Sequence, residues 1–426
     1  MKKNIVYGLG LIGILMTIIG CDKEQSVAKR YDATDIVLAD EGILIDGKNA
    51  STNKKDAVYV ANDIVYYRDG MDFTYGEGTE KDAHSEEDAA GHVVVHITEP
   101  GNYVISGTIS KGQIAVDLGK DAKDDEEAVV TLILNQADIN CDVAPAIIFY
   151  HVYECASTKK SKASNVVDTK NAGANILLID DTVNYINGSY VAKIYDEVEL
   201  NSKGTKIKDA SKLHKYDGAI YSEMSMNIDG EKLKNGQLII NAENEGIDTE
   251  VHLTINGGDI RINSGNDGIN CNKDDVSVIT MNNGNVEIIV NGATGEGDGI
   301  DSNGWIVMNG GTLKSYACGF SMDSGIDSGK GIHIHGGTVV ASGNMIDRIA
   351  ESNQEYRVFR LHEGQKSGTT ITLKDSNLKV VEEWTFPNDF SNVVISTERL
   401  VMDEEYTVWS GENKLEVDEK ELKLDK

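Results

Sequence analysis

Apolar and polar residues alternate in short stretches that recur through the middle of the chain, and each stretch ends at a glycine-containing turn. The turns are Asn256-Gly257-Gly258, Asn282-Asn283-Gly284, Asn309-Gly310-Gly311 and His335-Gly336-Gly337. One and three positions before each turn the residue is apolar, and the positions between them are mixed. The apolar set is Leu253, Ile255, Ile279, Met281, Ile306, Met308, Ile332 and Ile334. A period of two predicts a β-strand with one buried face.

The alternation resumes after each turn and predicts a second strand in every repeat. Its inward positions are Ile260, Val286, Leu313 and Val339. Its outward positions are Arg261, Glu287, Lys314 and Val340. Because the phase is the same in all copies, we expect equivalent residues to stack in ladders about 4.8 Å apart.

The spacing of the repeats falls in the range of about 20 to 50 residues that indicates a solenoid. No amphipathic helix separates the strands, which excludes a doubly wound sheet with helical crossovers. Crossovers between parallel strands are almost always right-handed. We therefore predict an all-β chain folded as a right-handed parallel β-helix. Glycine, at 43 of 426 residues, is abundant and proline, at 3, is rare, as expected for a chain with many tight turns.

Acidic or amide residues flank a Gly-Ile step in each repeat, so stacking places carboxylates above one another. Two such charges repel by about 3 kcal/mol at a separation of about 5 Å and an effective dielectric of about 20. Calcium relieves this repulsion and accepts irregular sets of carboxylate, amide and carbonyl oxygens. The alternative is that these residues cap turns by accepting backbone hydrogen bonds. The candidate calcium ligands are Glu245, Asp248, Asp267, Asn270, Asp298, Asp301, Asp323 and Asp327.

The N-terminus has the pattern of a lipoprotein signal peptide. Lys2 and Lys3 precede a short apolar run that ends at Gly20-Cys21. Cleavage before Cys21 and lipidation of its thiol would anchor the chain to a membrane by acyl chains. The alternative is an ordinary secretory signal that happens to contain a cysteine. We expect an exported protein, lipid-anchored on the extracellular face of the cell membrane.

This pattern divides the chain into four segments. Residues 1–21 form the signal peptide, 22–34 a polar tether, 35–411 the β-helix domain and 412–426 a charged C-terminal tail. Four further cysteines remain, namely Cys141, Cys155, Cys271 and Cys318. Export permits disulfides, with Cys141 and Cys155 as the best pair, whereas a lone cysteine in a β-helix is an ordinary core residue.

The formal charge of −30 limits the partners. Such a charge repels nucleic acid, so we predict no nucleic-acid partner. It also repels an acidic polysaccharide unless cations intervene. We expect a monomer whose acidic loops are mostly solvated surface.

Several segments resemble a bacterial family of exported carbohydrate-binding β-helix proteins that bind cellulose and acidic sugars such as polygalacturonate. They are residues 101–109, 112–117, 130–135, 144–147, 217–222 and 390–397, followed by Tyr406-Thr407-Val408. The resemblance covers roughly residues 35–411. It implies a fold similar to that of calcium-dependent pectate lyases, with calcium bound along the β-helix. Insertions at residues 150–174, 195–215 and 345–367 depart from the family pattern and leave the choice of glycan open.

Three outward residues are candidates for carbohydrate contact. Trp305 is placed to stack on a sugar ring, and Arg261 and Lys314 to meet uronate carboxylates. The alternative for the two cations is that Arg261, Glu287 and Lys314 alternate in sign along one column and neutralise one another. Trp384 and Trp409, in contrast, are expected in the core.

Two other functions stay open at this point. A pectate-type lyase would use calcium and a basic residue of lowered pKa, for which Lys273 and Lys330 are candidates. Each follows an acidic turn, where neighbouring carboxylates raise the pKa of a lysine, and this favours binding without catalysis. A calcium-dependent adhesin or surface scaffold would share the same fold and anchor.

Overall fold

The structure is a computed structural model that describes residues 26–419, and in this part the chain is built almost entirely of β-strands. The α-helices among these residues are short, α1 (Val27–Arg30) and α2 (Glu86–Ala90). The predicted all-β class is therefore confirmed. The predicted signal peptide and Cys21 lie outside the described residues.

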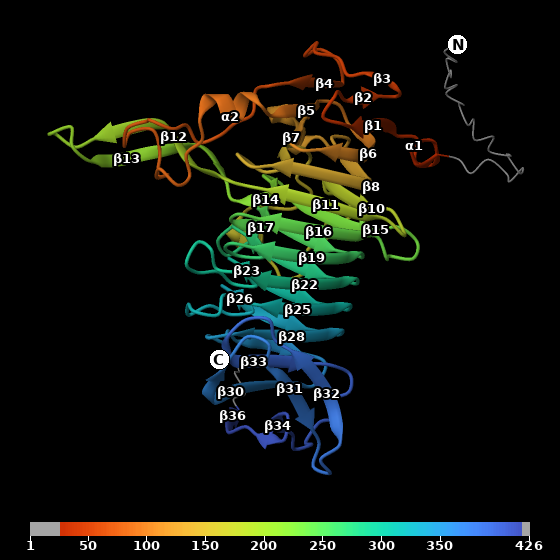
Figure 1. Cartoon of the computed structure of the whole chain (residues 1–426), viewed down its shortest axis with the longest axis vertical. Helices are drawn as coiled ribbons and strands as arrows, with labels where there is room; N and C mark the ends of the chain where they lie inside the picture. The colour runs from red at the N-terminus through yellow and green to blue at the C-terminus, as the bar shows by residue number, and fades with distance from the viewer. Residues whose placement is uncertain (1–25, 420–426) are drawn as a thin grey trace, which may run out of the picture.

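The strands stack along the long axis of the molecule in three runs (Figure 1). The first run contains β1 (Thr34–Leu38), β6 (Gly101–Ile109), β8 (Val130–Cys141), β10 (Ala174–Leu178), β15 (Met226–Gly230), β18 (His252–Ile255), β21 (Val278–Met281), β24 (Trp305–Met308), β27 (Gly331–Ile334) and β29 (Ile349–Ser352). The second contains β11 (Val183–Gly188), β16 (Gln237–Ala242), β19 (Asp259–Ser264), β22 (Asn285–Val290), β25 (Thr312–Tyr316) and β28 (Thr338–Gly343). The third contains β5 (Val93–Ile97), β7 (Gly112–Asp117), β9 (Ile147–His151), β14 (Gly218–Ser222), β17 (Glu245–Thr249), β20 (Ile269–Cys271), β23 (Ile300–Ser302) and β26 (Ile326–Ser328).

Successive strands within each run pair in parallel, and the chain visits the runs in the same order in each repeat. Leu253, Ile279, Ile306 and Ile332 pair in one column, as the repeat predicts. Ile260, Val286, Leu313 and Val339 pair in another. All eight side chains are buried in one continuous core. The predicted strand phase and its inward face are confirmed.

The outward face differs from the prediction where other segments cover it. Val340 is fully buried, because the C-terminal part of the chain packs over it. Thr254 is also buried, since the hydroxyl of Thr169 in the 150–174 insertion donates a hydrogen bond of 2.7 Å to it. These covering segments lie outside the repeat, and the alternation pattern therefore could not show which strand positions they cover.

A two-stranded hairpin, β12 (Val191–Leu200) with β13 (Ile207–Tyr216), projects from the side of the stack (Figure 1). Residues of the 66–85 segment hold its base, where Glu77 forms an ion pair of 2.7 Å with Lys193. The hairpin returns to the stack at Tyr216, directly before β14. It thus delivers the residues at the end of β13 to the third run.

The parallel stack ends at β29, earlier than the predicted boundary at residue 411. β30 (Tyr356–Gln365), β33 (Phe390–Ser396) and β36 (Val417–Glu419) pair antiparallel, and β33 also pairs with β28. A second antiparallel sheet contains β31 (Thr370–Lys374), β32 (Val380–Thr385), β34 (Thr407–Ser410) and β35 (Asn413–Lys414). A separate apolar core lies among these strands. Both β35 and β36 fall in the segment predicted as a charged tail.

The other end of the stack also carries antiparallel strands. β2 (Leu44–Ile45) pairs with β1 and β3 (Lys48–Asn49), and β4 (Val58–Ala61) pairs with β5. The described end of the predicted tether contains α1, and the Tyr31 hydroxyl donates a hydrogen bond of 2.7 Å to Glu231. This part of the segment therefore contacts the body of the protein.

All four cysteines of the described chain are free. Cys141, Cys271 and Cys318 are buried and fill the core, while Cys155 is half-buried. The pairing of Cys141 with Cys155 is not formed. In the part of the chain that the structure describes, neither the length nor the apolar content of any helix suffices for a membrane crossing.

Candidate functional site

The acidic residues of the Gly-Ile repeats follow the third run of strands in two columns. In the first column Asp248, Asn270, Asp301 and Asp327 pair directly on β17, β20, β23 and β26. This is the stacking expected from the repeat. Tyr221 of β14 continues the column beyond Asp248.

The second column contains Glu245, Asp267 and Asp298. The amide of Gly246 donates to the carbonyl of Asp267, and that of Gly268 to the carbonyl of Asp298, both at 3.0 Å. Asp217 lies beside this column, because its neighbour Gly218 pairs with Glu245 and the Glu245 amide donates to the Asp217 carbonyl at 3.1 Å. The Asp217-Gly218-Ala219-Ile220 segment carries the same acidic-Gly signal with one inserted residue, so the sequence contained this clue.

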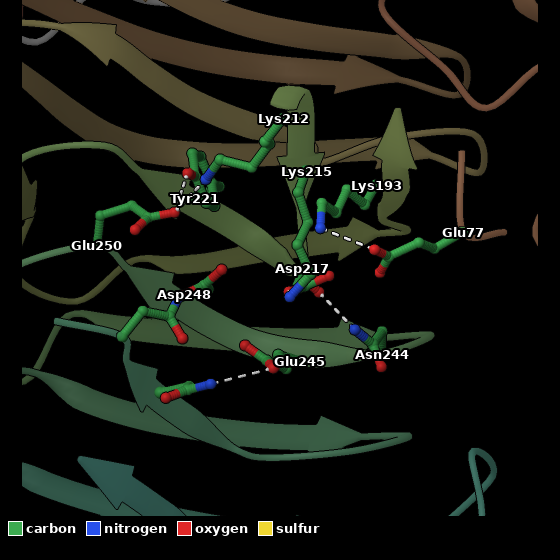
Figure 2. Close-up of polar contacts among 12 residues, drawn as sticks. Glu77, Lys193, Lys212, Lys215, Asp217, Tyr221, Asn244, Glu245, Asp248 and Glu250 are labelled. Atoms are coloured by element: carbon green, nitrogen blue, oxygen red, sulfur yellow. Dashed lines mark hydrogen bonds and ion pairs between the residues drawn. The ribbon is translucent and has the colours of Figure 1, made fainter. Parts of the chain in front are cut away.

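At the end of the two columns nearest β14 lies a group of five residues that we call the acidic cluster. Its members are Asp217, Glu245, Asp248, Asp267 and Asn270. The carboxylates of Asp217, Glu245 and Asp248 lie close together beneath the hairpin (Figure 2). Glu245 is 5% exposed and Asp248 1%. Burial, with repulsion from neighbouring carboxylates, raises the pKa of both Glu245 and Asp248 far above their ordinary values. The cluster therefore favours uptake of a proton or a cation.

Two buried oxygens of the acidic cluster have no hydrogen-bond partner, namely Glu245 Oε2 and Asn270 Oδ1. The other Glu245 oxygen, Oε1, accepts a hydrogen bond of 3.2 Å from Asn270 Nδ2. Buried polar atoms without partners are rare, because each loses its hydration without compensation. Unpaired carboxylate and amide oxygens are also the donors that calcium prefers, and the residues present therefore fit a calcium ion.

Lys215, at the end of β13, reaches the same place and forms an ion pair with Asp217 (Figure 2). Burial lowers the pKa of Lys215, but attraction to Asp217, Glu245 and Asp248 outweighs it, and the pKa is raised. A single ammonium stands against four carboxylates in the cluster. The sequence indicated only that residues 195–215 are an insertion, and Lys215 was not among the predicted site residues.

Farther along the columns the carboxylates also accept hydrogen bonds from backbone amides. Asp267 accepts a hydrogen bond of 2.7 Å from the Asp298 amide, and Asp298 accepts one of 2.6 Å from the Ser324 amide. Asp323 accepts one of 2.8 Å from the Gly297 amide. The turn-capping interpretation therefore applies to these three residues, whereas Glu245 keeps a free oxygen.

Burial has the largest effect on the pKa values of the carboxylates in this region. It raises the pKa of Asp298 to about 9 and that of Asp301 to about 6, despite opposing backbone hydrogen bonds. Asp347 joins the end of the column, where it accepts a hydrogen bond of 3.0 Å from the Ser328 amide, and burial raises its pKa to about 6. Asp347 lies outside the repeat motif, and no sequence pattern pointed to it.

A groove borders the acidic cluster at Tyr221. It encloses about 620 Å³, and we call it the lysine groove because of five cations in its wall. They are Lys123, Lys159, Lys162, Lys212 and Lys273. Lys212 and the Tyr221 hydroxyl each contact Glu250 at 3.0 Å. The same wall also contains four carboxylates, those of Asp124, Glu154, Glu223 and Glu250, so its cations exceed its anions by one.

The residues predicted to contact carbohydrate lie elsewhere on the stack. Trp305 is half-buried on β24 of the first run, between Val278 and Gly331. Arg261 and Lys314 share a column of the second run, separated by Glu287. Arg261 also forms an ion pair of 3.3 Å with Asp259. The structure thus groups Arg261 with Lys314, but neither with Trp305 nor with the acidic cluster. Trp384 and Trp409, expected in the core, are half-buried in the C-terminal part.

Comparison with known proteins identifies the family. The family described as "carbohydrate-binding domain-containing protein" matches residues 91–383, well over half of the chain, and the protein belongs to it. Carbohydrate is therefore its ligand class. No curated protein matches the sequence. A solved structure of a polysaccharide lyase-like protein from C. thermocellum, a gadolinium derivative, is 20% identical over 75% of this chain and 93% of its own, with a TM-score of 0.38.

Proposed function

We propose that the protein binds acidic polysaccharide, such as polygalacturonate, without cleaving it, through calcium held in the acidic cluster and the lysine groove beside it. The observation that carries the proposal is the pair of unpaired buried oxygens, Glu245 Oε2 and Asn270 Oδ1, within a group of carboxylates. Membership in a carbohydrate-binding family supplies the ligand class.

Glu245, Asp248 and Asn270 would hold the ion, with Asp217 and Asp267 as further oxygen donors. A calcium ion bound there would supply positive charge and could be coordinated by a uronate carboxylate. Lys215 offsets part of the negative charge and orients Asp217 through their ion pair. The backbone of successive strands fixes the spacing of the donors, since Asp248 and Asn270 pair directly.

The lysine groove extends the proposed binding surface. Each uronate unit carries one carboxylate. Lys162 and Lys273 offer ammonium groups to such carboxylates in the wall of the lysine groove, which also includes Tyr221. Cellulose has no charge and gains nothing from these contacts. We therefore infer a preference for acidic over neutral polysaccharide, with cellulose as the alternative ligand.

The lyase alternative requires a lysine or arginine of lowered pKa close to the calcium. Lys215 is the lysine that contacts the acidic cluster, and its pKa is raised, which makes it a poor base. Lys330 forms an ion pair of 2.7 Å with Asp275, and Lys273 lies in the wall of the groove. These contacts favour binding over elimination. Release of unsaturated oligouronides by purified protein would identify a lyase instead.

We further propose that the stack is a right-handed parallel β-helix on the extracellular face of the membrane. Parallel pairing in three runs supports the helix, and the strong preference of parallel crossovers supports its hand. The Lys2-Lys3 and Gly20-Cys21 pattern supports export and lipidation. Incorporation of a labelled fatty acid, lost in Cys21→Ala, tests the anchor, and we expect the protein to act as a monomer.

Neutralising Glu245 tests the role of the cluster. We expect Glu245→Gln to lower calcium-dependent retention on polygalacturonate by about tenfold, because it removes one charge from the coordinating set. The matched control is Glu363→Gln, an exposed carboxylate on β30, which should bind as the unaltered protein does. Equal retention by the two variants would contradict a calcium site at the cluster. Affinity electrophoresis in polygalacturonate gels, with calcium or chelator, provides the measurement.

A further inference from the structure

A second group of potential metal ligands lies on the first run, away from the acidic cluster. His333 on β27 and His335, two positions later, project from the same side of the chain. Glu351 on β29 pairs directly with His333. Their ligand atoms all lie within 4.8 Å of one another, the one such group of three or more found among the described residues.

The distances suit a small tetrahedral ion. His333 Nδ1 lies 3.3 Å from Glu351 Oε2. Two ligand atoms bound at about 2.1 Å to a tetrahedral zinc ion are about 3.4 Å apart. The two rings lie edge to face with centroids 6.1 Å apart, and a ligand nitrogen of each ring lies within 4.8 Å of the other and of a Glu351 carboxylate oxygen. Two imidazoles and one carboxylate form a common set of protein ligands for zinc.

Asn309 orients one of the two imidazoles. His335 Nδ1 lies 3.1 Å from Asn309 Oδ1, which leaves Nε2 of that ring for a metal. The Asn165 amide nitrogen from the 150–174 insertion lies 3.3 Å from Nδ1 and 3.4 Å from Nε2 of His333, so it contacts this ring without selecting one nitrogen. The Glu351 side chain is 58% exposed, and an ion therefore has access.

We propose that His333, His335 and Glu351 form a binding site for a divalent transition metal of the zinc class. This site differs from the acidic cluster in its ligand atoms. It offers imidazole nitrogens, whereas the donors of the acidic cluster are all oxygens and suit calcium. His335 also lines a cavity of about 590 Å³ with Asn256, Asn282 and Asn309. A fourth coordination position is thus open toward a groove of hydrogen-bonding side chains. The site does not depend on the proposed calcium function.

Calorimetric titration with zinc chloride, in excess calcium, tests this proposal on the purified protein. We expect one zinc ion per chain. Cobalt, as a spectroscopic substitute, should give the strong visible absorption of a tetrahedral site. His335→Ala and Glu351→Gln alter side chains at the surface and should each weaken zinc binding by at least about tenfold, as should Asn309→Ala through loss of orientation. Thermal melting without metal checks that each variant remains folded.

The matched control is His362→Ala. His362 also contacts two carboxylates, but Glu416 lies 3.3 Å from Nδ1 and Asp418 2.9 Å from Nε2, on opposite sides of the ring. These groups do not converge on one point, and the control variant should bind zinc as the unaltered protein does. Absence of zinc binding, or unchanged binding by His335→Ala and Glu351→Gln, would overturn the proposal. Loss of binding in His362→Ala would place the ion elsewhere and overturn it as well.

Discussion

The acidic-Gly-Ile steps require glycine because neighbouring strands approach too closely to admit a Cβ atom. A Cβ atom on Gly268 would lie 2.2 Å from Ile288 Cγ2 and 2.5 Å from the Gly299 carbonyl oxygen. Gly246 and Gly299 face a carbonyl oxygen of the next repeat at the same 2.5 Å. Any larger residue would therefore push the strands apart at the point where the acidic columns form.

We predict that Gly268→Ala destabilises the protein by about 1–3 kcal/mol, because the core must expand to admit a methyl group. The midpoint of urea unfolding measures the effect. Gly364→Ala is the control, since the nearest atom to its added Cβ is 3.4 Å away. If both variants unfold at the same urea concentration, close packing is not what requires glycine at position 268.

Residues in register were predictable because their environment repeats. The burial of Leu253 and Ile260 follows from period-two alternation that recurs in every copy. Residues whose environment comes from an insertion were not. Val340 is buried by the C-terminal part, and Lys215 reaches the acidic cluster only because the hairpin returns there. Asp347 joins the column from outside the motif.

At the level of whole elements, the acidic columns predict an unusual dependence of stability on pH. Burial raises the pKa of Asp298 from 3.8 to about 9, and the values of Asp301 and Asp347 to about 6. In the unfolded chain these groups ionise near their ordinary pKa. Between the two values the folded state binds more protons than the unfolded state, so stability falls as pH rises.

We therefore expect the melting temperature in chelator to fall continuously from about pH 4 to about pH 9, most steeply up to about pH 6, where Asp301 and Asp347 contribute in addition to the groups of higher pKa. In the proposed function calcium takes the place of these protons, and its stabilising effect should then be larger at pH 8 than at pH 5. Thermal melting followed by circular dichroism, with calcium and with chelator, measures both trends. A melting temperature in chelator that rises with pH would show that the columns are not proton-loaded in the folded state.

The two insertions illustrate how elements outside the repeat define the candidate sites. The 150–174 segment covers Thr254 and brings Asn165 to His333, while the β12–β13 hairpin brings Lys215 to Asp217. The family resemblance marked residues 150–174 and 195–215 as departures from the family pattern. The sequence could not show where they lie, because long-range contacts of an irregular segment leave no periodic signal.

At the scale of the whole molecule, the charge of −30 and an acidic polysaccharide ligand are compatible only through local positive groups. In the proposed function, calcium in the acidic cluster and the lysines of the groove beside it provide these positive groups. Both repulsion by the whole molecule and attraction at the site weaken with salt. A calcium requirement at moderate ionic strength is therefore the specific signature of the proposed function.

Depletion of the purified protein from solution by insoluble polygalacturonate and by cellulose, each with calcium and with chelator, measures calcium-dependent polysaccharide binding. We predict retention on polygalacturonate that chelator abolishes, and weaker retention on cellulose. Retention on polygalacturonate that is unchanged by chelator would contradict the calcium-built site. No retention on either polymer, with the fold intact by circular dichroism, would contradict polysaccharide binding itself and direct attention to a protein partner.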